Sequence, residues 1–172
     1  KIYNKHSSNW KVSLIDTGID SMTGGRLKRL KNYLSGETFM MTYGDAVSDV
    51  DINEILKFHK SHGKLVTVTA VRPPARFGEM AITNENKVTN FREKPQIKEG
   101  WINGGYFVIE PEFLETIQDD QTVLEKKPLQ EAASKNQLMA YFHEGFWQCM
   151  DTKRDKDLLD NMINKRSTPW LK

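Results

Sequence analysis

The sequence predicts an α/β protein in which a mixed β-sheet is flanked by helices. In the first half of the chain, apolar strand-like runs alternate with amphipathic helix patterns, which is typical of βα crossover units in a parallel sheet. After Gly78, several short strand-like runs follow, which indicates mixed or antiparallel additions to that sheet. The 172 residues are enough for one domain with a sizeable core.

The predicted strands are recognised by alternation or by runs of β-branched residues, and "KLVTVTAV" at 64–71 has the strongest pattern. In open α/β sheets, ligands bind at the carboxyl ends of the parallel strands, so we expect the site at that edge. In chain order, strands are expected at 11–16, 37–43, 64–71, 79–82, 87–94, 102–110, 138–145 and 147–151.

The predicted helices carry apolar residues at helical spacing. The second of them has the best-defined ends, because Asp51 with Glu54 three residues later forms a capping-box pattern and Gly63 suits the end. Helices are expected at 26–34, 50–63, 111–118, 124–136 and 152–167.

The composition excludes several classes of protein. A formal net charge of +2 gives no electrostatic basis for binding nucleic acid or an anionic membrane. No apolar run approaches membrane-spanning length. A single cysteine, Cys149, excludes an internal disulfide framework and fits a reducing compartment, so we expect a cytoplasmic protein.

Three aspartates lie in "TYGDAVSDVDI" at 42–52, and they differ in context. Asp45 follows a predicted strand after only Gly44, so its side chain is expected at the ligand-binding edge of the sheet. Asp51 is better explained as the N-cap of the next helix. Asp49 is a loop residue for which the sequence gives no role.

The stretch "DSMTGGR" at 20–26 has two interpretations. It is either a flexible turn before a helix or an anion site. In the second case Gly24 and Gly25 expose backbone N–H groups at a helix N-terminus and Arg26 adds a positive charge.

Other residues that carry chemistry elsewhere are less informative here. The four histidines have no metal-ligand spacing with Cys149, so a zinc site is not expected. His59 and His62 lie on a predicted helix and are expected to be solvated. Phe146 and Trp147 are expected in the core or in a pocket wall, and Cys149 is expected to be buried.

Six motifs occur in order along the chain and together resemble the sugar-nucleotidyltransferase family. The wider family shares "FREKP" and a strand followed by "GD", whereas "DSMTGGRL" and "GFWQCMDT" resemble its cytidylyl branch. The motifs are "DTGIDSMTGGRL", "TYGDAVSDVDI", "PPARFG", "FREKP", "INGGYFVI" and "FWQCMDT". The resemblance spans nearly the whole chain and implies a Rossmann-like nucleotidyltransferase fold.

The resemblance implies a reaction as well as a fold. CTP and α-D-glucose 1-phosphate would give CDP-glucose and pyrophosphate, as a precursor for dideoxyhexoses of bacterial surface polysaccharide. The cofactor would be Mg²⁺, and the assembly would be a homo-oligomer. The sugar phosphate oxygen itself attacks the α-phosphorus, so the protein must neutralise charge and align two polyanions rather than supply a nucleophile.

Each site residue implied by the resemblance matches a family motif. Asp45 and Asp151 match the metal ligands, and Arg26 and Lys94 match catalytic cations. The residues that match nucleotide or sugar contacts are Ser21, Gly25, Arg26, Gly44, Gly78, Glu93, Lys94, Asn103 and Gly104. Without the family, Glu93 and Lys94 would be interpreted as a surface ion pair.

The glycine-rich loop and following lysine that open the family's fold are not in this sequence. We therefore expect a piece of a longer polypeptide: the C-terminal two-thirds of one catalytic domain. Residues 1–72 would be the rest of the nucleotide-binding half and 73–172 the sugar-binding half. Such a piece is expected to be inactive alone and to expose the edge of the strand that leads to Asp45.

Three alternatives remain open from the sequence. The same reaction could use UTP or dTTP, because base choice depends largely on the loop that is not in this sequence. The "DVD" at 49–51 could instead be the D-x-D metal motif of a glycosyltransferase, although Asp51 fits a helix cap better. The chain could also be a non-catalytic module that binds sugar phosphate.

Overall fold

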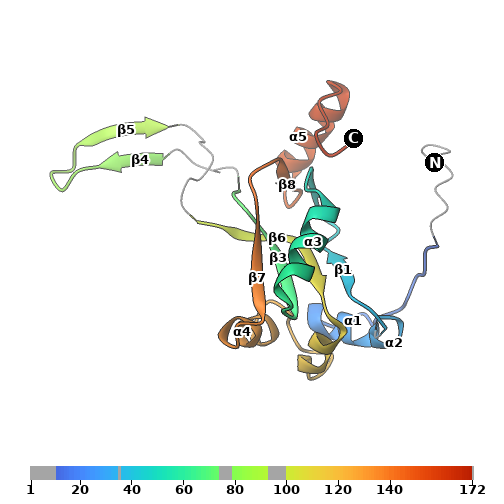
Figure 1. Cartoon of the computed structure of the whole chain (residues 1–172). Coiled ribbons are helices and arrows are strands. Elements are labelled where there is room, and N and C mark those ends of the chain that lie inside the picture. The colour runs from blue at the N-terminus through green and yellow to red at the C-terminus, as the bar shows by residue number, and fades with distance from the viewer. Residues whose placement is uncertain (1–10, 35, 74–78, 93–99, 172) are drawn as a thin grey trace.

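A mixed four-stranded sheet forms the centre of the molecule, with its strands in the order β1-β6-β3-β7 (Figure 1). The computed structural model describes residues 11–34, 36–73, 79–92 and 100–171. The strands are β1 (Phe39–Thr42), β2 (Ala46–Ser48), β3 (Val66–Val71), β4 (Glu79–Ile82), β5 (Val88–Arg92), β6 (Ile102–Ile109), β7 (Leu138–His143) and β8 (Trp147–Cys149).

The helices are short and follow the predicted order. The predicted helix over 26–34 is divided into two, and the predicted helix over 111–118 is a 3₁₀ helix. The helices are α1 (Thr23–Arg29), α2 (Lys31–Leu34), α3 (Ile52–His62), η1 (Pro111–Thr116), α4 (Lys127–Ser134) and α5 (Lys153–Asn164). None of the described helices is both long and apolar enough to cross a membrane.

The predicted strand over 11–16 does not form. Val12 is 72% and Leu14 95% exposed, and no described strand pairs with this segment. Alternation of apolar and polar residues gives a strand an apolar face, but a strand is stable only when its backbone groups are paired with a neighbour. The prediction for 11–16 was therefore wrong.

The sheet is less parallel than the first half of the sequence predicts. β1 and β3 run in the same direction, but β6 lies between them and is antiparallel to both, so that Ile109 is opposite Phe39 on one side and Val66 on the other. β3 and β7 are parallel neighbours. β1 forms one edge of the described sheet, as the sequence predicts.

The main core lies on one face of the sheet and is closed by elements from both halves of the chain. Phe107 and Ile109 point from β6 to this face, and Phe113 and Leu114 of η1 pack against them. Leu27 of α1, with residues of α4, completes the cluster. Burial of these apolar side chains fixes α1, η1 and α4 against the sheet.

The other face of the sheet carries α3, whose ends are fixed as predicted. The Asp51 carboxylate accepts hydrogen bonds from the N–H groups of Asn53 and Glu54, at 2.8 and 3.3 Å. Gly63 has a φ of +62°, the left-handed conformation that glycine adopts most easily at a helix end. The predicted helix cap at Asp51 is confirmed.

His59 of α3 is buried, which contradicts the prediction that it is solvated. Only 1% of it is exposed, and its Nε2 and Nδ1 atoms lie 2.9 Å from Glu110 Oε1 and 2.8 Å from Thr67 Oγ1. His62 Nε2 contacts the same Thr67 hydroxyl at 2.8 Å, and His62 Nδ1 accepts from the Lys64 N–H. Helical spacing alone could not show that Thr67 of β3 and Glu110, just after β6, contact this histidine.

One assignment of protons satisfies every group in this chain of contacts. The Lys64 N–H donates to His62 Nδ1, so His62 Nε2 donates to Thr67, Thr67 donates to His59 Nδ1, and His59 Nε2 donates to Glu110. Both histidines are then neutral. Burial lowers the pKa of His62, with smaller contributions from His59 and Lys64, and this shift favours the neutral form of His62.

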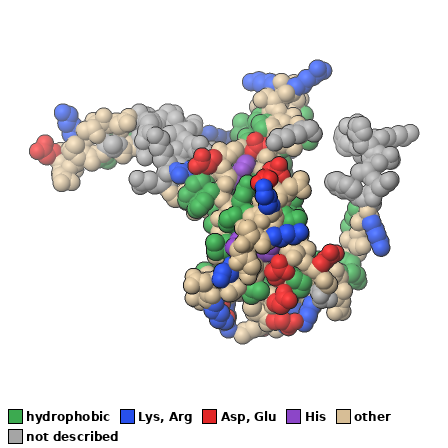
Figure 2. Space-filling model, viewed as in Figure 1, with side chains coloured by type: hydrophobic (Ala, Val, Ile, Leu, Met, Phe, Trp, Pro, Cys, Tyr) green, Lys and Arg blue, Asp and Glu red, His purple; other side chains and the backbone are tan. Residues whose placement is uncertain are grey.

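A separate hairpin of β4 and β5 extends away from the sheet (Figure 1). Three of its large apolar side chains, Met80, Ile82 and Val88, are at least half exposed. Among the described residues on the face drawn in Figure 2, basic and acidic side chains are interspersed over several elements.

We predict that His59→Leu lowers the free energy of unfolding by about 2–3 kcal/mol, because it removes a hydrogen bond to the Glu110 carboxylate and another to Thr67. Urea denaturation measures this change. Lys57→Gln on the exposed face of the same helix is the control and should change stability by less than about 0.5 kcal/mol. Equal effects of the two substitutions would contradict the importance of the buried network.

Candidate active site

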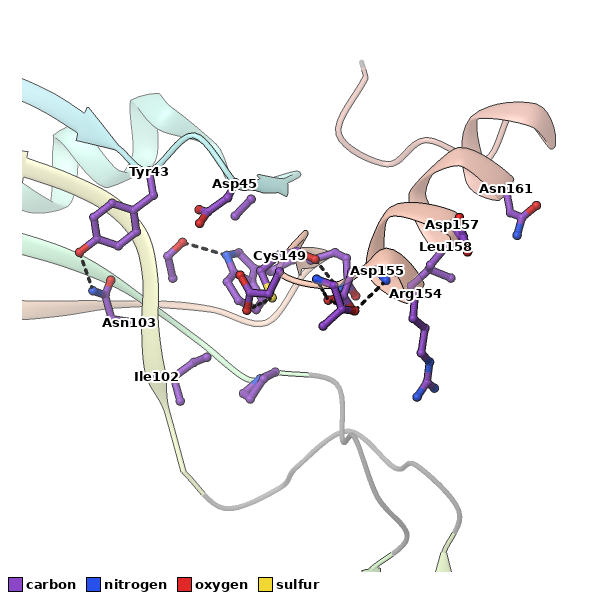
Figure 3. Close-up of a pocket in the computed structure, with 17 residues that line it drawn as sticks. Tyr43, Asp45, Ile102, Asn103, Cys149, Arg154, Asp155, Asp157, Leu158 and Asn161 are labelled. Carbon is purple, nitrogen blue, oxygen red and sulfur yellow. Dashed lines mark hydrogen bonds between the residues drawn. The ribbon is translucent and has the colours of Figure 1, made fainter. Parts of the chain in front are cut away.

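A cavity of about 1040 Å³ opens at the carboxyl edge of β1 and β3, where β6 begins. Figure 3 shows Tyr43, Asp45 and Asn103 on one side of it and residues of α5 on the other. β8 lies between these two groups and contributes Trp147 and Cys149. The cavity is therefore at the edge where an open α/β sheet is expected to bind ligands.

Asp45 and Asp151 reach this cavity through a small antiparallel ribbon formed by β2 and β8. Ala46 pairs with Cys149, and one step further the Met150 N–H donates to Asp45 O at 2.7 Å. Both aspartates therefore lie at the same end of the ribbon. Both are exposed, and both line the cavity.

The donor atoms at this place suit a hard divalent cation. Mg²⁺ in proteins is usually held by one or two carboxylates, with substrate phosphates and waters completing the octahedron. Asp45 and Asp151 supply two carboxylates that face one cavity. In the described part of the chain, no group of three or more His, Cys, Asp or Glu side chains could hold a metal ion by itself.

Asn103 and Gly104, which the family resemblance assigns to the hexose pocket, both line the same cavity. The Asn103 amide is held at both ends, because Nδ2 donates to Tyr43 Oη at 3.2 Å and Oδ1 accepts from Gly105 N at 2.8 Å. Gly105 has a φ of +80°, and a Cβ there would lie 2.7 Å from the Tyr43 ring. Glycine is therefore required for this close approach.

Tyr43 is a pocket residue that the sequence did not indicate. Its hydroxyl donates to Glu125 Oε1, and Glu125 Oε2 accepts from Thr23 at the start of α1. Burial raises the pKa of Tyr43 above its ordinary value, and the hydrogen bond to Glu125 raises it further. The phenol is therefore neutral and acts as a hydrogen-bond donor at neutral pH.

Ser21, Gly25 and Arg26 do not line this cavity. Ser21 is buried, and a Cβ on Gly25 would lie 2.2 Å from Asp120 O. The Arg26 guanidinium donates to the Thr17 hydroxyl at 2.9 Å and also to the Ile19 carbonyl. Arg26 therefore holds the segment before α1, and Gly25 allows α1 to pack closely against Asp120.

Of the two interpretations of "DSMTGGR", the anion site with exposed N–H groups at Gly24 and Gly25 does not fit the structure. Both N–H groups donate to the Thr122 carbonyl, at 3.0 and 3.2 Å. Neither residue has space for a side chain, because the 120–124 segment packs directly on them. The glycines are explained by this close packing, and they lie inside α1, so only residues 20–22 of the stretch precede the helix.

Gly44 lies between Tyr43 and Asp45, and a Cβ at Gly44 would meet no atom within 4 Å. Gly78, Glu93 and Lys94 lie outside the described residues.

Arg154 is a cation in the cavity wall that the sequence analysis missed. It lies in the first turn of α5, where Thr152 and Asp155 form a capping box. Positive charge in the first turn of a helix is unfavourable with respect to the helix dipole. This unfavourable placement of a positive charge, three residues after Asp151, is the sequence feature that could have indicated Arg154.

The aromatic and sulfur predictions have mixed outcomes. Trp147 lines the cavity and donates from Nε1 to Gly104 O at 2.8 Å, so its predicted place in a pocket wall is confirmed. Phe146 is stacked on Trp170, with ring centroids 5.3 Å apart. Cys149 is half-buried rather than buried, and its thiol lies 3.5 Å from Asp151 Oδ2.

The mixed α/β sheet with a cavity at its strand ends defines the class of fold, and similarity to known proteins identifies the family. The family model described as "Nucleotidyl transferase" matches residues 23–164. The chain belongs to this nucleotidyl transferase family.

Two relatives share substantial sequence identity with the chain. It is 46% identical over 171 residues to glucose-1-phosphate cytidylyltransferase of Salmonella typhimurium, covering 99% of the chain and 66% of that protein. It is 32% identical over 162 residues to the probable glucose-1-phosphate cytidylyltransferase of Bacillus subtilis, covering 94% of the chain and 63% of that protein. The chain thus spans roughly two thirds of the length of these relatives or slightly less.

A solved structure supports the same fold. HddC from Yersinia pseudotuberculosis superposes with a TM-score of 0.60 at 18% sequence identity, covering 83% of this chain and 62% of that one. At that identity the similarity concerns the fold, and it confirms the predicted mixed α/β nucleotidyltransferase sheet.

We predict that Gly25→Ala lowers the free energy of unfolding by about 1–3 kcal/mol, because its Cβ overlaps the Asp120 backbone. Gly44→Ala is the matched control and should stay within about 0.5 kcal/mol, because its Cβ enters open space. Thermal denaturation of both variants measures the difference. A neutral Gly25→Ala would contradict the close packing of Gly25 against the Asp120 backbone.

Proposed function

We propose that the protein transfers a cytidylyl group from CTP to α-D-glucose 1-phosphate, giving CDP-glucose and pyrophosphate. One observation carries the proposal: Asp45 and Asp151, far apart in sequence, face one cavity together with Asn103 and Gly104. The names of the relatives in Salmonella typhimurium and Bacillus subtilis support glucose 1-phosphate and the cytidylyl group.

The reaction joins two anions in one displacement. An oxygen of the sugar phosphate forms a bond to the α-phosphorus of CTP, the bond between the α-phosphorus and the bridging oxygen breaks, and pyrophosphate leaves with the electron pair. Asp45 and Asp151 would hold Mg²⁺, which supplies neutralising charge to the phosphates when it is bound. The protein itself supplies alignment and electrostatic stabilisation.

The remaining roles follow the family motifs and the cavity. Asn103, held by Tyr43 and Gly105, orients its amide at the cavity and is assigned to the hexose with Gly104. Glu93 and Lys94 are assigned to the sugar hydroxyls and its phosphate, with Lys94 as a catalytic cation.

The nucleotide contacts and the division of the domain are assigned in the same way. Arg26 is assigned as the second catalytic cation. Residues 1–72 belong to the nucleotide-binding half and 73–172 to the sugar-binding half in this proposal. The remaining assigned binding residues are Ser21, Gly25, Gly44 and Gly78.

The glycosyltransferase alternative is weakened by the partners of its candidate motif. Asp51 caps α3, and Asp49 Oδ1 accepts from Phe146 N at 2.7 Å and lies 3.0 Å from His143 Nε2. Neither carboxylate of this "DVD" lines the cavity.

The biological setting is part of the proposal. The protein would act in the cytoplasm, and CDP-glucose would serve dideoxyhexose synthesis for surface polysaccharide. A homo-oligomeric state is supported by the exposed Met80, Ile82 and Val88 on the β4–β5 hairpin. Light scattering of the purified protein tests this part, and a monomeric mass would contradict it.

We predict that Asp45→Asn and Asp151→Asn each lower kcat/KM at least about 100-fold in the full-length form of the protein, because each removes a charge from the metal site. Asp157→Asn is a matched control, since Asp157 also lines the cavity but is paired with Lys153 on the surface of α5. Pyrophosphate release over a range of Mg²⁺ concentrations measures the effect. Comparable losses in Asp157→Asn and Asp45→Asn would contradict the assignment of the metal ligands.

We predict that CTP is used in preference to UTP and dTTP with glucose 1-phosphate as the acceptor. Parallel assays of pyrophosphate release with each triphosphate measure kcat/KM for the three bases. A higher kcat/KM with UTP or dTTP would contradict the choice of CTP, and the proposed nucleotidyl transfer would still hold.

A further inference from the structure

Four residues form a hydrogen-bonded cluster at the end of the β2–β8 ribbon that is remote from Asp45. Asp49 is joined to Phe146 twice: its N–H donates to Phe146 O at 3.2 Å, and its Oδ1 accepts from Phe146 N at 2.7 Å. Ser48 Oγ donates to Phe146 O at 2.8 Å. His143 Nε2 lies 3.0 Å from Asp49 Oδ1, so β7 is tied to the same point.

The geometry determines which nitrogen of His143 carries a hydrogen. Nε2 faces Asp49 Oδ1 at 3.0 Å, and Ser48 Oγ and Phe146 O each at 3.2 Å. The carboxylate and the carbonyl only accept, and the Ser48 hydroxyl hydrogen is used on Phe146 O. Nε2 must therefore be protonated and donate to Asp49.

The cluster is closely packed and mostly shielded from water. The side chain of His143 is 12% exposed and that of Asp49 is 26% exposed. A Cβ on Gly145 would lie 2.5 Å from Asp49 Oδ1 and 2.6 Å from the His143 ring. Glycine at 145 therefore allows the histidine and the aspartate to meet across the β7–β8 connection.

The cluster matters because the ribbon that it closes is very short. β2 and β8 have three residues each, so few backbone hydrogen bonds determine their register. A slip of one residue would turn every side chain of one strand to the opposite face. Asp45 and Asp151 leave the other end of this ribbon, so their relative position depends on the register that the cluster holds.

We propose that Asp49 and His143 are positioning residues that lock the register of the β2–β8 ribbon and thereby set the spacing of Asp45 and Asp151 for a divalent cation. The inference rests on the proposed metal-dependent transfer. In this proposal Asp49 acts on the pairing of β2 with β8, and it does not contact the metal or the substrate directly. Supporting partners of metal ligands commonly change metal affinity about 10–100-fold when they are removed.

The test compares three variants of the full-length form of the protein. His143→Leu and Asp49→Ala remove the interaction, and we expect the half-saturating Mg²⁺ concentration to rise about 10-fold in each, with kcat at saturating Mg²⁺ little changed. His143→Gln should restore a nearly native Mg²⁺ requirement, because the Gln amide nitrogen can donate from the place of Nε2.

His59→Leu is the matched control, because it removes another buried histidine–carboxylate contact outside the ribbon. It should lower thermal stability and leave the half-saturating Mg²⁺ concentration unchanged. An unchanged Mg²⁺ requirement in His143→Leu and Asp49→Ala, or an equal rise in His59→Leu, would overturn the proposal. So would a failure of His143→Gln to restore the native requirement.

Hydrogen exchange of the Met150 amide, which donates to Asp45 O, gives a readout that does not depend on catalysis. Faster exchange in His143→Leu, with near-native exchange in His143→Gln, supports a register lock even if the wild-type protein makes no CDP-glucose. Absence of CDP-glucose formation by the wild type would overturn the proposed function alone. Native exchange in all three variants would overturn the register lock.

Discussion

The pairing of β6 with both β1 and β3 is the interaction on which the sheet and the cavity depend. At one end of β6, Ile109 is opposite Phe39 and Val66, and it belongs to the main core. At the other end, Asn103 and Gly104 reach the cavity. One antiparallel strand therefore connects the apolar core to the polar site, and it brings together segments from both halves of the chain.

The β2–β8 ribbon is attached to this strand at the cavity end, and to β7 through His143 at the other end. Tyr106 Oη donates to Ala46 O at 3.3 Å, and Trp147 Nε1 donates to Gly104 O at 2.8 Å. Each strand of the ribbon thus has one side-chain hydrogen bond to or from β6. Since the cavity carboxylates are carried by the ends of the ribbon, their placement depends on a few directional bonds more than on apolar packing.

Sequence reasoning succeeded where the determining partners are local and failed where they are distant. The cap at Asp51 and the left-handed Gly63 are set within one helix, and both were predicted. The burial of His59 depends on Thr67 and Glu110, which belong to other elements, so helical periodicity could not give it. The insertion of β6 and the unpaired segment 11–16 likewise depend on which strands become neighbours.

The three aspartates between positions 45 and 51 show the same distinction at the scale of a few residues. Asp51 binds the N–H groups of its own helix, which follows from its position just before an amphipathic run. Asp45 follows a strand end, so its placement at the cavity also follows from local order, whereas pairing with β8 determines that Asp151 joins it. Asp49 is explained only by His143 and Phe146, almost a hundred positions later. Local pattern could identify a cap and a candidate ligand, but a carboxylate whose partners come from a distant connection can be understood only from the fold.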